Sequence, residues 1–209
     1  MQIIPGILET NWIDIEHRIQ QAKLFANTLH IDIIDGEFVN HKTFLDPAPF
    51  AKYSKEIFFE LHMMVIDPIK LVAPFAAAGF RRFLGHVEHM SSQKEFVDEA
   101  KKFGEAGLAL DGPTHESVIK VPFETLDTVL VYTSDHVGFS GPPLVPERLE
   151  KIRHLKRLTN IPIEVDGGIS DKTILKEKDA GATRFVSTSF LFHSENPAEQ
   201  YRQLVSLVQ

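Results

Sequence analysis

The chain has 209 residues, of which 43% are hydrophobic and 24% are charged, and this composition is typical of a globular protein. The length fits a single domain over residues 1–209 and leaves enough apolar material for a sizeable core. The formal net charge is −7, and no long run of Lys or Arg is present, which argues against nucleic acid as a partner.

The chain contains no cysteine, so disulfides and thiolate metal sites are excluded. A metal ion would need histidine and carboxylate ligands. The N-terminus lacks a basic segment followed by a long apolar run, and we expect no signal peptide. Apolar runs fall short of the ~20 residues that span a membrane. The sequence predicts a cytoplasmic protein that does not interact with a membrane.

Short β-rich runs recur along the whole chain, about 20–30 residues apart, which is the size of a strand–helix unit. The expected strands are Ile3–Leu8, Leu29–Ile34, Ile57–Val65, Arg82–Val87, Gly107–Leu110, Thr128–Thr133, Pro162–Val165 and Arg184–Ser187.

Helical patterns fill the gaps between these strands. Asp67-Pro68 predicts a helix with Asp67 as its N-cap, ending near Gly79. Apolar residues at helical spacing predict another helix over Pro146–Leu158. Asn196-Pro197 predicts the start of the last helix.

Alternating strands and helices of this number can form an open, doubly wound sheet or a closed barrel. An open sheet usually has a glycine-rich turn after its first strand. Here Glu9-Thr10-Asn11 follows the first strand and contains no glycine. The sequence therefore favours an α/β fold, a (β/α)₈ TIM barrel.

Polar residues stand at the C-terminal ends of three expected strands, where barrels of this type carry their active sites. His30 and Asp32 are two residues apart, so both side chains lie on the same side of their strand. His62 follows the apolar run Ile57–Leu61 on the third strand, and Asp166 ends the run Ile163–Val165 on the seventh. Each residue alone could be structural, but two histidines and two carboxylates together suit a borderline divalent metal.

Further histidines could support or approach this site. His86 and Glu88 are also two residues apart, and we expect them to face the pore and support the metal ligands, with His89 pointing away. Among the loop histidines, His136 is the one expected nearest the site. Asp35-Gly36 predicts a structural turn that closes the second strand.

Three segments rich in glycine or hydroxyl residues follow the sixth, seventh and eighth strands: Gly138–Gly141, Asp166–Gly168 and Ser187–Ser189. Barrels often bind phosphate on these loops through backbone N–H groups and a short helix N-terminus. Turn formation explains each segment alone. Their joint position predicts a phosphate site.

Six segments in this order resemble the ribulose-phosphate 3-epimerase family and together cover nearly the whole chain. They are Ile4–Leu8, His30–Val39, Leu61–Met64, His86–His89, Val137–Gly141 and Ile163–Ile169. The second and sixth segments are the most specific.

The resemblance implies a (β/α)₈ barrel that holds one divalent metal ion, zinc, iron, manganese or cobalt, on His30, Asp32, His62 and Asp166. It also implies that Asp32 and Asp166 are the acid/base pair. One would remove the C3 proton of a ketose phosphate and the other would return a proton to the opposite face of a metal-bound enediolate. The substrate- and phosphate-binding residues would be Gly6, Met64, Gly138, Ser140, Gly141, Gly167, Gly168, Thr188 and Ser189. A homo-oligomer is expected.

Several positions differ from the usual family pattern. Gly6 replaces a serine, Ile34 and Thr133 stand where methionines are expected, Ser140 and Pro142 replace a glycine and a glutamine, and Thr188-Ser189 replaces Gly-Ser. These changes leave the metal ligands intact and alter the groups around the substrate.

Three hypotheses follow from this pattern. The first is an epimerase that interconverts D-ribulose 5-phosphate and D-xylulose 5-phosphate. The second is a 3-epimerase of another ketose phosphate, such as a ketohexose 6-phosphate. The third is a barrel that binds a metal or a phosphorylated sugar without turnover.

Overall fold

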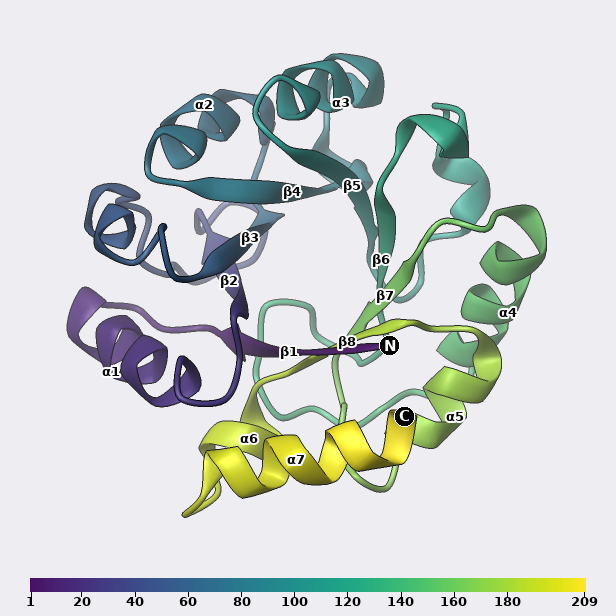
Figure 1. Cartoon of the computed structure of the whole chain (residues 1–209). Coiled ribbons are helices and arrows are strands. Elements are labelled where there is room, and N and C mark those ends of the chain that lie inside the picture. Colours follow the sequence, from purple (N-terminus) through teal and green to yellow (C-terminus); the bar gives the residue numbers. More distant parts are fainter.

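The computed structural model describes all residues, Met1–Gln209. Eight parallel strands pair in chain order and close into a barrel, and the helices lie around its outside (Figure 1). The predicted (β/α)₈ barrel is thus confirmed. The strands are β1 (Gln2–Ile7), β2 (Thr28–Ile34), β3 (Phe58–Met64), β4 (Phe80–His86), β5 (Glu105–Leu110), β6 (Thr128–Tyr132), β7 (Ile163–Asp166) and β8 (Arg184–Ser187).

The helices are unevenly distributed among the connections. No α-helix lies between β2 and β3 or between β5 and β6, where only short 3₁₀ helices occur. No helix is both long and apolar enough to cross a bilayer. The α-helices are α1 (Trp12–Ala22), α2 (Ile69–Ala77), α3 (Gln93–Lys101), α4 (Arg148–Leu158), α5 (Ile174–Ala180), α6 (Ser189–Phe192) and α7 (Pro197–Val208), and the 3₁₀ helices are η1 (Ala48–Lys52), η2 (Val87–His89), η3 (Glu116–Val118) and η4 (Phe123–Thr125).

Two predicted helix starts had different outcomes. Asn196 caps α7, because its side chain accepts a hydrogen bond from the Glu199 N–H at 3.2 Å. The prediction that Asp67 is an N-cap is wrong. Asp67 has φ +53°, and its carboxylate accepts a hydrogen bond from the Ser91 hydroxyl at 2.7 Å, so α2 begins only at Ile69.

Side-chain alternation divides each strand between two environments. On β2, Leu29, Ile31 and Ile33 belong to the main apolar core that packs under the surrounding helices. His30 and Asp32 alternate with them and face the barrel interior, in register with Glu60 and His62 of β3. The barrel interior therefore carries polar side chains, and buried polar groups of this kind require partners.

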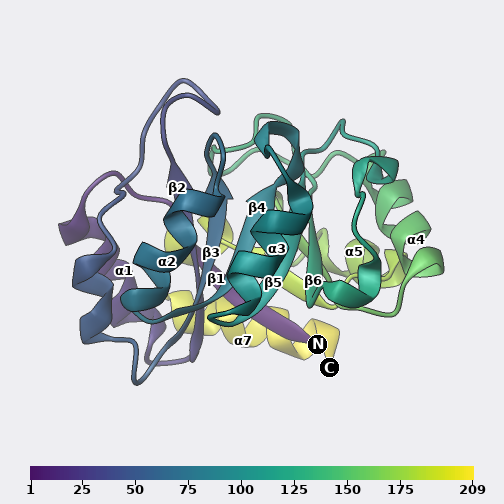
Figure 2. The same ribbon diagram turned by 90° about the horizontal axis from the view of Figure 1, so that it is seen from above.

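A layer of charged side chains fills the barrel beneath its mouth. Glu60 forms an ion pair with Arg82, and Arg82 Nε also donates to Glu105 at 2.7 Å. Glu60 and Glu164 are both fully buried and approach His30 from below. This layer supports the residues at the C-terminal ends of the strands. Figure 2 shows the loop after β2 rising above the barrel on that side.

Candidate active site

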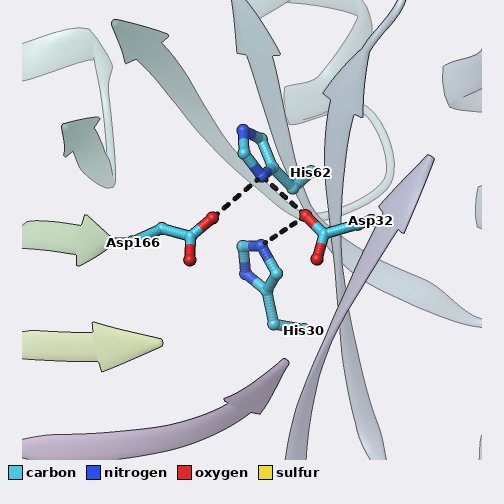
Figure 3. A group of neighbouring side chains, drawn as sticks. All are labelled: His30, Asp32, His62 and Asp166. Atoms are coloured by element: carbon cyan, nitrogen blue, oxygen red, sulfur yellow. Dashed lines mark hydrogen bonds and ion pairs between the residues drawn. The ribbon is translucent and has the colours of Figure 1, made fainter. Parts of the chain in front are cut away.

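Two histidines and two aspartates converge at the mouth of the barrel. His30, Asp32, His62 and Asp166 each offer a ligand atom, and these atoms lie within 4.8 Å of one another. His62 Nδ1 is 2.8 Å from Asp32 Oδ1 and 3.5 Å from Asp166 Oδ2. His30 Nε2 is 3.3 Å from Asp32 Oδ1. Figure 3 shows the two carboxylates approaching His62 from opposite sides.

The orientation of His30 is set by Glu60. His30 Nδ1 lies 2.7 Å from Glu60 Oε1, deep in the barrel. A carboxylate can only accept a hydrogen bond, so Nδ1 carries the proton in this contact. His30 Nε2 is buried and forms no well-directed hydrogen bond, although Asp32 Oδ1 lies 3.3 Å away. Its lone pair is therefore available to a ligand at the mouth whenever His30 is neutral.

The orientation of His62 depends on a chain of two further residues. Its Nε2 lies 2.9 Å from His86 Nε2, and His86 Nδ1 lies 3.0 Å from Glu88 Oε2. Because Glu88 accepts the Nδ1 proton of His86, His86 Nε2 accepts the Nε2 proton of His62. The Nδ1 atom of His62 is thereby turned toward the two carboxylates, 2.8 Å from Asp32 Oδ1 and 3.5 Å from Asp166 Oδ2. The predicted support from His86 and Glu88 is present as a pair of contacts, and His89 is exposed.

This donor set fits a divalent metal ion. Two imidazole nitrogens turned toward the mouth of the barrel and two carboxylates are ligands that borderline ions such as zinc accept. The buried His30 Nε2 is the strongest sign, because it forms no well-directed hydrogen bond within the protein and a buried polar atom left this way is costly. The surrounding carboxylates also favour a proton on His30. Burial would lower its pKa, but the charge of Asp32 and the nearby carboxylates of Asp32, Glu164 and Glu60 raise the pKa of His30 well above its ordinary value.

The two aspartates have different protonation properties. Burial alone would raise the pKa of Asp32, but the charge and hydrogen bonds of His30 and His62 outweigh burial and lower this pKa to about 2. Burial and the negative charge of Asp32 raise the pKa of Asp166 to about 6. Two like charges close together cannot both ionise easily. The carboxylate of Asp32 is therefore ionised, whereas Asp166 holds a proton more readily.

A pocket opens above these residues, between the loops that follow β6, β7 and β8. Tyr132 lies in its wall and is a residue that sequence reasoning missed, although it ends β6 as Asp166 ends β7. The pocket is lined by both aspartates and by eight of the nine predicted substrate residues: Met64, Gly138, Ser140, Gly141, Gly167, Gly168, Thr188 and Ser189.

Two expectations about this pocket are corrected by the structure, while the role of Gly6 in substrate binding stays a prediction. Gly6 lies in an adjoining hollow with Arg18 and His193. Thr133 does not stand in the place of a pocket methionine, because its hydroxyl points out of the barrel and donates to the Gly167 carbonyl at 2.6 Å. His136 is exposed and lines neither hollow.

Glycine is required where two of these loops pack together. Gly167 and Gly168 have φ of +106° and +74°, which side chains rarely adopt. A Cβ on Gly167 would lie 2.9 Å from the Ser134 nitrogen, and one on Gly168 would lie 2.8 Å from Leu144 Cα. The loops after β6 and β7 therefore fit together only with bare backbone at these positions.

Comparison with known proteins identifies the family. A family model for the ribulose-phosphate 3 epimerase family matches residues 2–192. The chain belongs to the ribulose-phosphate 3-epimerase family. The ribulose-phosphate 3-epimerase of Schizosaccharomyces pombe is 34% identical over 205 residues, covering 95% of this chain and 90% of that protein. The cytoplasmic isoform of Oryza sativa is 33% identical over 207 residues, covering 95% and 90%. These relatives are carbohydrate epimerases by name, and the present chain is an isomerase of the same family.

Solved structures of lower similarity share the fold alone. A 3-keto-L-gulonate-6-phosphate decarboxylase from Vibrio cholerae matches with a TM-score of 0.77 at 15% identity, covering 99% of this chain and 96% of that one. A 3-hexulose-6-phosphate synthase from Salmonella typhimurium matches with a TM-score of 0.73 at 12% identity, covering 100% and 98%. Both support the barrel and its chain order.

Proposed function

We propose that this protein is a metal-dependent 3-epimerase that interconverts D-ribulose 5-phosphate and D-xylulose 5-phosphate. The observation that carries the proposal is the approach of Asp32 and Asp166, from opposite walls, to one nitrogen of His62. A substrate bound between the two carboxylates would present one face to each. Inversion at carbon needs this arrangement, because the proton leaves from one face and returns to the other.

The protonation of the two aspartates supports their assignment as the acid/base pair. One group has to be ionised to accept the C3 proton, while the other has to carry a proton to donate. The low pKa of Asp32, about 2, favours the ionised form. The raised pKa of Asp166, about 6, brings protonation closer to neutral pH. After each turnover the two roles are exchanged, and the reverse reaction uses the same pair.

His30, Asp32, His62 and Asp166 would hold one divalent ion, such as zinc, iron, manganese or cobalt. When bound, the ion would supply positive charge against the negative charge that develops on the substrate oxygens as C3 loses its proton. The protein's own contribution is orientation. Glu60 holds His30, and His86 holds His62, so neither imidazole has to reorganise.

The remaining pocket residues would bind the sugar phosphate. Gly141, Gly167, Gly168, Ser140 and Ser189 line the pocket on the side of the β6, β7 and β8 loops and offer backbone N–H groups and hydroxyls. Such groups suit a phosphate. Gly138, Thr188 and Met64 line the same pocket and would contact the sugar. The substrate is thus a small phosphorylated sugar. A homo-oligomer stays a prediction, which light scattering of the purified protein tests.

The direct test is turnover by the metal-loaded protein. D-ribulose 5-phosphate is supplied, the formation of D-xylulose 5-phosphate is followed, and bound metal is measured in the same samples. We expect conversion by the wild type and by Asp179→Asn, which changes an exposed aspartate on α5. Asp166→Asn should lose activity by at least about 10²-fold. Conversion by the wild type no faster than by Asp166→Asn refutes the proposal.

A second candidate is a 3-epimerase of another ketose phosphate, such as a ketohexose 6-phosphate. It is favoured by the side chains of Pro142 and Thr188, which line the pocket at positions that differ from the usual family pattern. Exchange of the C3 hydrogen with solvent across a panel of ketose phosphates separates the two candidates. If D-ribulose 5-phosphate exchanges its C3 hydrogen faster than every other member of the panel by a wide margin, the second candidate function is excluded. Stoichiometric metal without exchange on any member would favour a binding protein without turnover.

A further inference from the structure

Gly6 and Thr188 share one space at the mouth of the barrel. Gly6 of β1 is in register with His30 of β2, so a side chain at position 6 would point into the barrel as His30 does. A Cβ built on Gly6 would lie 2.9 Å from Val186 Cγ1 and closer still to Thr188 Oγ1. The hydroxyl of Thr188 therefore already occupies the place that a side chain at position 6 would take.

The Thr188 hydroxyl is also free to bind a ligand. Thr188 follows β8 directly, and its side chain does not cap α6, the short helix that starts at the next residue. The neighbouring Ser187 hydroxyl differs, because it donates to the Ile169 carbonyl at 3.3 Å. Thr188 is partly exposed and lines both the pocket over the aspartates and the adjoining hollow that contains Gly6. It forms the boundary between these two spaces.

We propose that Thr188 is a specificity-determining residue, whose hydroxyl binds an oxygen of the substrate, and that Gly6 is the glycine that makes room for it. The inference rests on the proposed function, since the ligand is a ketose phosphate. The polar group beside position 6 is the Thr188 hydroxyl at the end of β8. A side chain at position 6 of β1 would fit only if the Thr188 side chain were shorter. The Thr188 methyl group adds bulk to the boundary. The pocket then selects substrates by one hydrogen bond and by width, and a site built to bind a hydroxyl discriminates strongly against analogues that lack it.

The first experiment tests the hydroxyl with two matched substitutions. Thr188→Val keeps the shape of the side chain and removes the hydroxyl, whereas Thr188→Ser keeps the hydroxyl. We expect Thr188→Val to raise KM for the preferred ketose phosphate about three- to tenfold with kcat within about twofold, as expected for the loss of one hydrogen bond. Thr188→Ser should stay within about twofold in KM for that substrate and accept bulkier ketose phosphates better. Equal KM values for wild type and Thr188→Val overturn the proposal.

The second experiment tests the shared space and needs no turnover. Thermal midpoints are measured for Gly6→Ala, Thr188→Ala and the double variant. Within Thr188 only the hydroxyl clashes with a Cβ at position 6, because Thr188 Cβ would lie 3.5 Å away, an ordinary contact; the 2.9 Å approach to Val186 Cγ1 is the same in both backgrounds. We expect Gly6→Ala to lower the midpoint by roughly 3–10 °C in the wild-type background, and by clearly less in the Thr188→Ala background. If Thr188 instead rotates away, Gly6→Ala should raise KM as Thr188→Val does.

The outcomes separate this inference from the proposed function. Calorimetric titration of the metal-loaded protein with D-ribulose 5-phosphate and with ketohexose 6-phosphates shows whether any ketose phosphate binds. No binding refutes the proposed function and the role of Thr188 together. Binding and turnover by the wild type, with no change in KM for Thr188→Val, refute the role of Thr188 alone. Additive effects of Gly6→Ala and Thr188→Ala on both midpoint and KM refute the shared space.

Discussion

His86 Nε2 lies 2.9 Å from His62 Nε2, and this contact decides which nitrogen of His62 faces the pocket. Glu88 fixes the orientation of His86, which in turn orients His62. Its Oε2 is 3.0 Å from His86 Nδ1, and its Oε1 accepts the Asp111 N–H at 2.8 Å, so the carboxylate is fixed at both ends. Burial alone would raise its pKa, but hydrogen bonds, first that from His86, lower the pKa of Glu88 to about 2. The hydrogen-bond chain from His62 through His86 therefore ends on the ionised carboxylate of Glu88.

Glu88→Gln should weaken metal binding roughly 10- to 100-fold, because an amide accepts less strongly and can present its NH₂ group to His86 instead. Competition with a chelator of known affinity, using zinc or cobalt, measures the change. Glu124→Gln, which changes an exposed residue of η4, is the matched control and should bind as the wild type does. Equal dissociation constants for Glu88→Gln and the control would show that the chain through His86 does not orient His62.

Asp166→Asn should leave one-sided proton exchange. If each aspartate serves one face of the substrate, Asp32 alone can still remove and return a proton on its own face. In deuterated water, the variant should place deuterium at C3 of one ketopentose phosphate and not of its epimer, with interconversion lowered at least about 10²-fold. Asp32→Asn should show the opposite preference. NMR of both epimers, with metal content measured alongside, checks this. Exchange on both epimers by either variant contradicts the two-face assignment.

Glu177 should make the folded protein less stable as pH rises. This glutamate of α5 is fully buried, and burial raises its pKa to about 8 although the Thr133 hydroxyl oxygen lies 3.2 Å from its Oε1 and favours the ionised form. The unfolded chain releases this proton near pH 4 to 5. Above that pH the folded state binds more protons than the unfolded state, so the free energy of unfolding falls with rising pH until about pH 8 and then levels off.

Glu177→Gln removes this ionisation and should gain stability relative to the wild type between pH 5 and 8.5, by as much as several kcal/mol. Urea denaturation of both proteins at the two pH values measures the difference. Glu150→Gln, at an exposed position of α4, should not change with pH relative to the wild type. A stability difference between Glu177→Gln and wild type that is the same at both pH values would show that Glu177 keeps an ordinary pKa.

Gly168→Ala should cost more stability than Gly141→Ala. Both glycines have positive φ, +74° and +99°, so both substitutions carry backbone strain of about 1 kcal/mol. A Cβ on Gly141 would meet nothing within 4 Å, whereas one on Gly168 would press against the backbone of Leu144. We expect an additional loss of about 1–3 kcal/mol for Gly168→Ala, measured by urea denaturation. Equal losses would mean that the loops after β6 and β7 do not pack as described.

The barrel could be predicted from the sequence because strand alternation is a local property. Each expected strand was found, with bounds that differ by at most two residues. The connections were less predictable. The turn at Asp67 has the residues of a helix start, but the Ser91 hydroxyl from a distant segment binds its carboxylate. Contacts of this kind override local capping preference and cannot be seen in the chain order.

The candidate site was predictable only in part. His30, Asp32, His62 and Asp166 stand at strand ends, and the structure brings them together. Their roles as ligands and as an acid/base pair stay proposals until metal and turnover are measured. The sequence did not show that Tyr132 enters the pocket while Thr133 leaves it. Adjacent residues of a strand face opposite ways, so an error of one position reverses the assignment.

The sequence by itself determined which residues alternate on each strand, the eightfold repetition, and the family to which the chain belongs. Only the tertiary structure decided which residues far apart in the sequence are in steric contact or joined by hydrogen bonds. Glu88 reaches His62 through His86, and Thr188 of the β8 end fills the place beside Gly6 of β1. Barrel closure pairs the first strand with the last. Steric fit and hydrogen bonding between them depend on distances that no local pattern of residues encodes.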